Sequence, residues 1–158
     1  MPTSLKAFEN ICRRAHIVDE SVLRSVRSHP FEERNLFPDF PKKVRKLFDD
    51  GHYSEATFEA LKFLDKTVQR ISGKRGSGFN LMMSVFGGDN PDIKINALCS
   101  ESEIDEQKGY QFMFSGIMSA IRNPKGHEHS IEDDLDTCLD HLSMISTLLR
   151  RLIESGHI

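Results

Sequence analysis

Residues 111–127 read QFMFSGIMSAIRNPKGH, an apolar helix that is forced to end. The first eleven of these residues are apolar or small on most sides, which is typical of a helix buried on most sides. Pro124 lacks a backbone N–H and disfavours the α region for Asn123, while Gly126 can adopt the positive φ of a tight connection. We therefore expect a rigid corner between two helices.

This corner combines three groups that are suited to catalysis at a phosphodiester. Arg122 carries a permanent positive charge, Asn123 carries an amide, and His127 carries a base that titrates near neutral pH. An arginine at the end of a helix also commonly binds carbonyl groups or pairs with a carboxylate. These residues alone therefore leave both a structural and a catalytic role open.

The helical period extends over most of the chain. We predict helices at residues 4–16, 19–27, 42–50, 53–71, 80–86, 103–122 and 130–154. Ser54 is the expected N-cap of the longest one, and Ser130 with Asp133 suggests a capping box for the last. No segment shows sustained strand alternation, so the predicted class is all-α, an up-down bundle of four main helices with additional N-terminal helices.

The 158 residues are enough for one domain with a real core. We expect residues 1–38 to form an N-terminal helical extension and linker, and residues 39–158 to form the bundle. The proline-rich segment 29–41 is the linker, and its large apolar side chains should hold it to the core: Phe31, Leu36, Phe37 and Phe40.

Charge is distributed unevenly along the chain. Residues 1–75 carry 15 Lys and Arg against 11 Asp and Glu, whereas residues 76–158 carry 6 against 13. A globally basic surface, the usual sign of avid nucleic-acid binding, is therefore missing. Any contact with RNA must be local, and the charge polarity could instead support self-association.

The sequence also indicates where the protein acts. The first ten residues, MPTSLKAFEN, lack the apolar region of a signal peptide, and no apolar run is long enough to cross a membrane. The three cysteines are widely separated and are best explained as small buried apolar residues in a reducing compartment. We therefore expect a cytoplasmic protein with no membrane partner.

Two further stretches could bind ligands. Residues 72–78, SGKRGSG, differ from a nucleotide-binding P-loop because the lysine precedes the glycines and a helix leads in, but Lys74 and Arg75 could contact RNA, as could Lys125. His127 and His129 lack the spacing and the partners of a metal site, so we expect no metal and no cofactor. His141 is expected on a hydrated helix surface.

The helix predicted at residues 103–122 mixes large apolar side chains with Gly109, Ser115, Gly116, Ser119 and Ala120. Small residues let a second helix approach closely. This pattern fits a helix–helix dimer contact beside Arg122, and it equally fits ordinary core packing.

The chain resembles the HEPN superfamily, whose signature is an Arg, a polar residue that is often Asn, and a His a short distance further on, between the last two long helices. More closely, it is similar to the Ymh-type branch, conserved hypothetical proteins of prophages and defence loci. The matching stretches are residues 53–56, 81–82, 105–109 and 116–128, within a region of about residues 40–155.

The resemblance implies a four-helix bundle that dimerises and acts as a metal-independent endoribonuclease, often a toxin that cuts RNA during phage infection. Arg122 and His127 would be catalytic and Asn123 supporting. The 2′-OH of RNA would be the nucleophile, with His127 transferring a proton and Arg122 stabilising the developing charge. An antitoxin or another defence protein could be a partner.

The alternative is a non-catalytic HEPN-like module that binds protein or RNA. Its partner surface would be the acidic C-terminal half, including Glu132, Asp133, Asp134 and Asp136.

Overall fold

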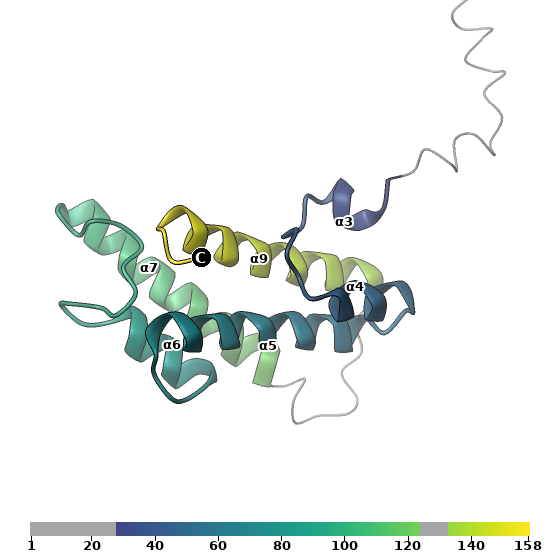
Figure 1. Ribbon diagram of the computed structural model, residues 1–158, viewed down its shortest axis with the longest axis horizontal. Coiled ribbons are helices and arrows are strands. Elements are labelled where there is room, and N and C mark those ends of the chain that lie inside the picture. The colour runs from purple at the N-terminus through teal and green to yellow at the C-terminus, as the bar shows by residue number, and fades with distance from the viewer. Residues whose placement is uncertain (1–27, 124–132) are drawn as a thin grey trace, which may run out of the picture. The chain divides into compact units, whose positions relative to one another are not determined.

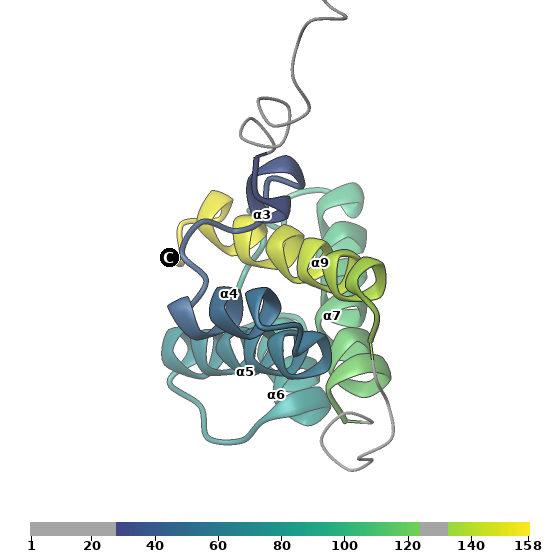
Figure 2. The ribbon, with the colours of Figure 1, turned by 90° about the vertical axis from the view of Figure 1, so that its right-hand side faces the viewer.

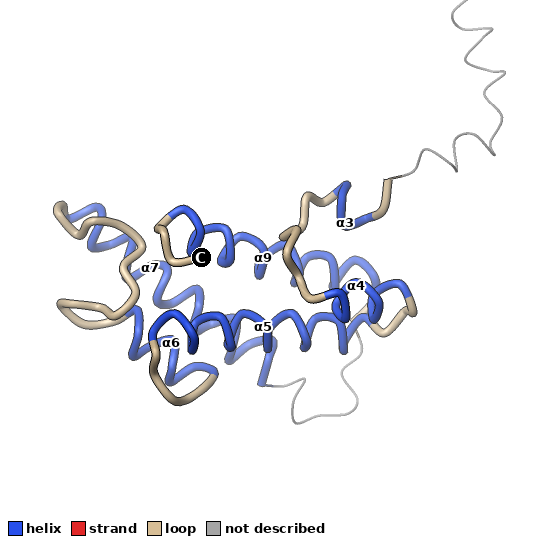
Figure 3. Tube along the Cα trace, in the orientation of Figure 1, coloured by secondary structure: helices blue, strands red, loops and turns tan. Residues whose placement is uncertain are grey.

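The computed structural model describes residues 28–123 and 133–158 (Figure 1). These residues form helices, turns and loops, and no strand occurs among them (Figure 3). The predicted all-α class is therefore confirmed for this part of the chain. None of the helices described there is both long enough and apolar enough to span a lipid bilayer.

The chain divides after Glu33 into two compact units. Within the first unit the structure describes only residues 28–33, which contain the short helix α3 (Pro30–Glu33). The helices predicted at residues 4–16 and 19–27 lie outside the described residues.

The second unit, residues 34–158, contains the remaining described elements. They are α4 (Lys42–Asp49), α5 (Tyr53–Ser72), α6 (Gly78–Phe86), α7 (Glu101–Ile117), the π-helical segment η1 (Met118–Arg122) and α9 (Leu135–Glu154). Helix α5 packs against α4, α6, η1 and α9, and α6 also pairs with α7. Figures 1 and 2 show α4 and α9 lying along α5.

The apolar stripe of α5 explains its central position. Ala56, Ala60, Leu61, Leu64 and Val68 recur at the helical period and are fully buried. The alanines allow neighbouring helices to approach closely, and each leucine or valine contributes about 1.5–3 kcal/mol by leaving water. Helix α5 is therefore the element around which the second unit packs.

The predicted N-cap of α5 is wrong. The helix begins at Tyr53, and His52 occupies the N-cap position without a side-chain hydrogen bond to the helix. The Ser54 hydroxyl oxygen instead accepts a hydrogen bond from the backbone N–H of Asp133, at 2.6 Å. Serine is a common N-cap residue, but the hydroxyl oxygen of Ser54 binds Asp133, which lies 79 positions further along the chain.

The predicted start of the last helix at Ser130 is also wrong. Helix α9 begins at Leu135, and Asp134 has an extended backbone and accepts a hydrogen bond from the Thr137 N–H at 2.7 Å. Hydrogen bonds from Thr137 lower the pKa of the Asp134 carboxyl group. Ser130 itself lies outside the described residues.

The linker is anchored as predicted within the second unit. Leu36, Phe37 and Phe40 are buried, and the Phe37 and Phe40 rings pack together and against Phe63 of α5. The Phe37 N–H also donates to the Ser146 hydroxyl of α9 at 2.9 Å. Phe31 belongs to α3 in the first unit.

The irregular segment before α7 is held by a buried glutamine. The Gln107 side chain accepts a hydrogen bond from the Ile95 N–H at 2.7 Å and donates to the carbonyls of Phe86 and Ile93 at 2.8 and 3.0 Å. Three backbone groups without helical partners are satisfied by this one amide. Gln107 therefore fixes the chain between α6 and α7.

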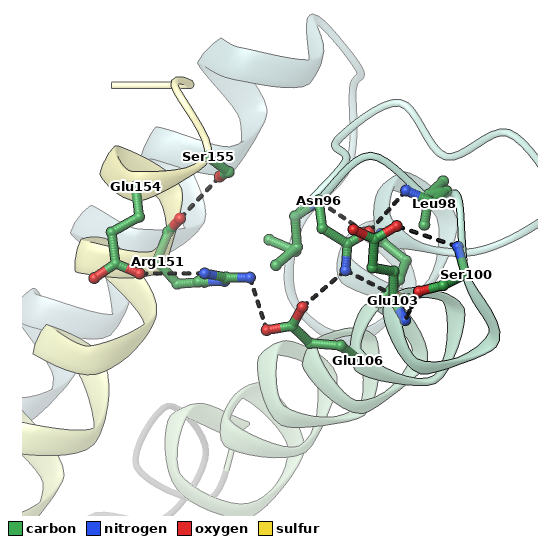
Figure 4. A network of polar contacts seen from close by, with 10 residues as sticks. Asn96, Leu98, Ser100, Glu103, Glu106, Arg151, Glu154 and Ser155 are labelled. Atoms are coloured by element: carbon green, nitrogen blue, oxygen red, sulfur yellow. Dashed lines mark hydrogen bonds and ion pairs between the residues drawn. The ribbon is translucent and has the colours of Figure 1, made fainter.

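A polar network joins the end of α9 to α7 and the preceding loop (Figure 4). Arg151 donates to Glu106 at 2.7 Å, and the other oxygen of Glu106 accepts from Asn96 at 2.8 Å. At the start of α7, Ser100 and Glu103 form a capping box that the sequence analysis overlooked. Together these contacts fix the end of the second unit at which α7 begins and α9 ends.

We expect Gln107→Met, which keeps the shape of the side chain, to lower the free energy of unfolding by about 2–4 kcal/mol, because buried backbone groups lose their partner. Denaturant unfolding measures this change. Lys108→Met is the matched control, since Lys108 lies next to it on α7 with a side chain that is 61% exposed. Equal effects of the two substitutions would contradict the role assigned to Gln107.

Candidate functional site

Arg122 is positioned by a change of helix type. Helix α7 ends at Ile117, and the next five residues form the π-helical segment η1, which ends at Arg122. Single π-helical turns inside α-helices are rare and occur often at functional sites. The sequence correctly predicted helical backbone up to Arg122, but not this change of hydrogen-bonding pattern.

Asn123 departs from the prediction. Its φ of −66° and ψ of −47° lie in the α region, which the following proline was expected to disfavour. The reason is the hydrogen bond from the Asn123 N–H to the Met118 carbonyl, which continues the π-helical pattern. The predicted break at Asn123 is therefore wrong, and helical backbone continues through this residue.

The guanidinium group of Arg122 has few partners among the described residues. Its Nη1 lies 3.5 Å from the Asn123 Oδ1, and its Nη2 lies 4.0 Å from the Asp65 Oδ2. Its Nε is buried and has no hydrogen-bond partner there, although the side chain as a whole is 28% exposed. Because a guanidinium has five N–H donors, most of them have no partner within residues 28–123 and 133–158.

Asp65 is a functional candidate that the sequence analysis missed. Its side chain, on α5, is only 3% exposed. One carboxylate oxygen accepts the Gly78 N–H at 2.8 Å, and the other faces Arg122 and lies 3.5 Å from the Gln69 amide nitrogen. The available signal was an acidic residue on the apolar stripe of α5, four positions after Leu61.

The loop of residues 73–77, with Lys74 and Arg75, is called the basic loop, and its end lies beside Arg122. Gln69 donates to the Gly76 carbonyl at 2.6 Å, and Asp65 binds the first N–H of α6, so two side chains of α5 hold the end of this loop. A Cβ atom built on Gly78 would lie 3.3 Å from the Arg122 Nη1. The structure thus brings the end of the basic loop next to Arg122, although the two are far apart in the sequence.

The two predicted RNA-binding residues of this loop differ in their surroundings. Arg75 is exposed. Lys74 is also exposed but forms an ion pair with Asp92, in the segment before α7. The other residues predicted for the site, Lys125 and His127, lie outside the described residues, as does His129.

The predicted acidic surface is partly wrong. The Asp133 side chain is 4% exposed, accepts a hydrogen bond from the Thr57 hydroxyl at 2.9 Å, and lies 3.3 Å from the His141 Nδ1. His141 was expected on a hydrated surface, but it is partly buried and paired with Asp133. Asp134 and Asp136 are exposed, and Glu132 lies outside the described residues.

No group of three or more His, Cys, Asp or Glu side chains within residues 28–123 and 133–158 is arranged to hold a metal ion.

Fold and site together define an all-α protein in which a buried carboxylate faces an arginine at the end of a π-helical turn. A family model described as "Protein of unknown function (Hypoth_ymh)" matches residues 34–152, and the chain belongs to this family. The matched region includes both Asp65 and Arg122. Comparisons with curated proteins and with solved structures gave no match.

We expect Asp65 and Arg122 to be energetically coupled, because the buried carboxylate is poorly screened by solvent. A double-mutant cycle with Asp65→Asn and Arg122→Met should give a coupling free energy of at least about 1 kcal/mol. The control is the Arg34–Asp140 pair, which is closer, at 3.0 Å, but exposed on both sides.

For that control pair we expect a coupling below about 0.5 kcal/mol, as for other exposed ion pairs. Urea unfolding of the two cycles provides the measurement. A coupling for Asp65 and Arg122 no larger than that of the control would show that Asp65 does not hold the arginine.

Proposed function

We propose that this protein is a metal-independent endoribonuclease of the HEPN type, which cuts RNA by attack of the substrate's own 2′-OH group. The observation that carries the proposal is the state of Arg122, a partly buried guanidinium with most of its donors unused among the described residues. The resemblance of the motif Arg122–Asn123 followed by His127 supports the same reaction.

An incoming phosphate group would complete the bonding of Arg122. The Arg122 side chain is 28% exposed, and arginine can bind a phosphate through two parallel hydrogen bonds. Asp65 balances the positive charge from 4.0 Å without a direct hydrogen bond to the guanidinium. The arginine is therefore held in place and its donors stay available to a ligand.

The proposed reaction uses these groups in one displacement. His127 of one copy takes the proton from the 2′-OH, whose oxygen forms a bond to phosphorus while the bond to the 5′-oxygen breaks. Arg122 donates hydrogen bonds to the negative charge that develops on the phosphoryl oxygens. The leaving 5′-oxygen takes a proton from a second histidine, which the same residue of a second copy would supply.

An exposed face of α7 supports the proposed homodimer. Phe112 and Met113 are 63% and 50% exposed, and Gly109 and Gly116 have open space where a side chain would be. These four residues recur at the helical period and so lie on one face. This face leads directly into η1, so a dimer contact made through it would lie beside the segment that carries Arg122.

The second candidate function is a non-catalytic HEPN-like module that binds protein or RNA, for example an antitoxin or another defence-system partner. The observation that favours it is charge. The chain has a net charge of −3. Of the two basic residues in the loop, Lys74 is already paired with Asp92.

We expect the purified protein to cut RNA in the presence of EDTA and to leave 2′,3′-cyclic phosphate and 5′-OH ends. His127→Ala should reduce the rate by about 100-fold or more through loss of proton transfer. Arg122→Ala should cost about 100- to 1,000-fold through loss of charge stabilisation. Incubation with total tRNA and mRNA, followed by analysis of the product ends, provides the measurement.

Arg34→Ala is the control for that experiment, because Arg34 is an exposed arginine of the same unit. It should cut at the rate of the unmodified protein. Cleavage that EDTA stops, or that persists in His127→Ala, would exclude the proposed reaction. Inactivity on every RNA would favour the interaction module.

We also expect Phe112→Glu to convert the dimer into a monomer, because a charge on the α7 face would be buried at the interface without a partner. Met144→Glu is the control, since Met144 is similarly exposed, at 51%, but belongs to α9. Sedimentation at tens of micromolar protein distinguishes the two states. A monomeric wild type, or a dimer that survives Phe112→Glu, would be evidence against this interface.

A further inference from the structure

Phe79 is exposed where the pattern of α6 predicts burial. Met82 and Phe86 follow Phe79 by three and seven positions, so the three residues share one face of the helix. Met82 and Phe86 are 0% and 1% exposed, but Phe79 is 42% exposed. The apolar face of α6 thus extends beyond the core at the first turn of the helix.

The helix that carries Phe79 packs against the segment that carries Arg122. Phe86 stacks on Phe114 with ring centroids 4.2 Å apart, so this face of α6 turns toward α7. The two helices run in opposite directions, and the start of α6 packs against η1. At the first turn of α6, the shared face therefore turns toward η1.

The backbone of Phe79 lies close enough to the Arg122 guanidinium for one nucleotide to contact both residues. A Cβ atom on Gly78 would lie 3.3 Å from the Arg122 Nη1. Since neighbouring Cα atoms are about 3.8 Å apart, the Phe79 Cα lies within about 9 Å of that nitrogen. A phosphate bound by Arg122 would place an adjacent base within reach of the Phe79 ring.

We propose that Phe79 is a stacking platform for a base of single-stranded RNA whose phosphate binds Arg122. The inference rests on the proposed function and adds the form of the substrate. Proteins that bind single-stranded RNA stack unpaired bases on aromatic side chains, because every base has a flat face. Arg75, exposed in the loop before α6, adds positive charge on the approach to the ring.

This arrangement selects unpaired RNA. In a duplex the faces of each base are covered by its neighbours in the stack, whereas in a loop or a single-stranded end they are accessible. Stacking on phenylalanine also carries little sequence information. The site therefore takes single-stranded segments with weak base preference.

The absence of tryptophan from the sequence allows a direct test. In a His127→Ala background, which prevents cleavage, Phe79→Trp introduces one fluorophore at the proposed platform. Single-stranded RNA of about 12 nucleotides, within the usual range of such sites, should quench its fluorescence by stacking. The same RNA as a duplex should not, and neither should the single strand added to Met144→Trp, whose fluorophore lies on α9.

Affinity provides the second measurement. In the same background, Phe79→Leu keeps an apolar side chain but removes the aromatic face, and it should weaken binding of the single strand by about 5- to 150-fold. Phe79→Tyr should bind within about twofold of the parent, since it keeps the ring. Met144→Leu should leave the affinity unchanged.

Equal affinities of Phe79→Leu and the parent protein, or unquenched Phe79→Trp fluorescence, would overturn the inference. So would a parent protein that binds no RNA. A Phe79→Leu protein whose oligomeric state changes while its RNA affinity does not would assign the ring to a protein interface. RNA binding that depends on Phe79, without any cleavage by the wild type, would support the stacking platform and refute the nuclease. Cleavage that does not depend on Phe79 would support the nuclease and refute the platform.

Discussion

The buried carboxylate of Asp65 is the constraint on which the site depends. A charge with a side chain only 3% exposed must be compensated by hydrogen bonds and by a nearby opposite charge. Asp65 obtains the first from the Gly78 N–H and the second from Arg122. Since these groups belong to α5, α6 and η1, one side chain fixes the relative placement of three elements.

This constraint explains how an arginine can be both fixed and available. Its charge is compensated from 4.0 Å, and its only hydrogen bond among the described residues, to Asn123, is long at 3.5 Å. The π-helical turn ends at this residue, and the loop that Gln69 holds lies beside it. In the proposed cleavage and base stacking, an RNA phosphate binds to the donors of Arg122 that have no partner among the described residues.

The features that sequence predicted best are those set by local periodicity. The long helix α5, the helix α9 from Leu135 onward and the helical backbone up to Arg122 follow from the spacing of apolar residues. The features that it missed depend on distant partners. Ser54 was assigned to its own helix, yet it serves Asp133, and His141 was expected on the surface, yet it pairs with the same aspartate. No local pattern could have named Asp65 as the partner of Arg122.

The most direct test of the account is whether Arg122 binds the phosphate of RNA. The side-chain Nε–H resonance of Arg122 can be followed by NMR in ¹⁵N-labelled protein and identified by its loss in Arg122→Lys. Adding a single-stranded RNA with 2′-O-methyl groups, which removes the nucleophile, should shift this resonance, because the exposed part of the same guanidinium gains an acceptor. A resonance that stays unchanged while the RNA is bound would contradict the central claim.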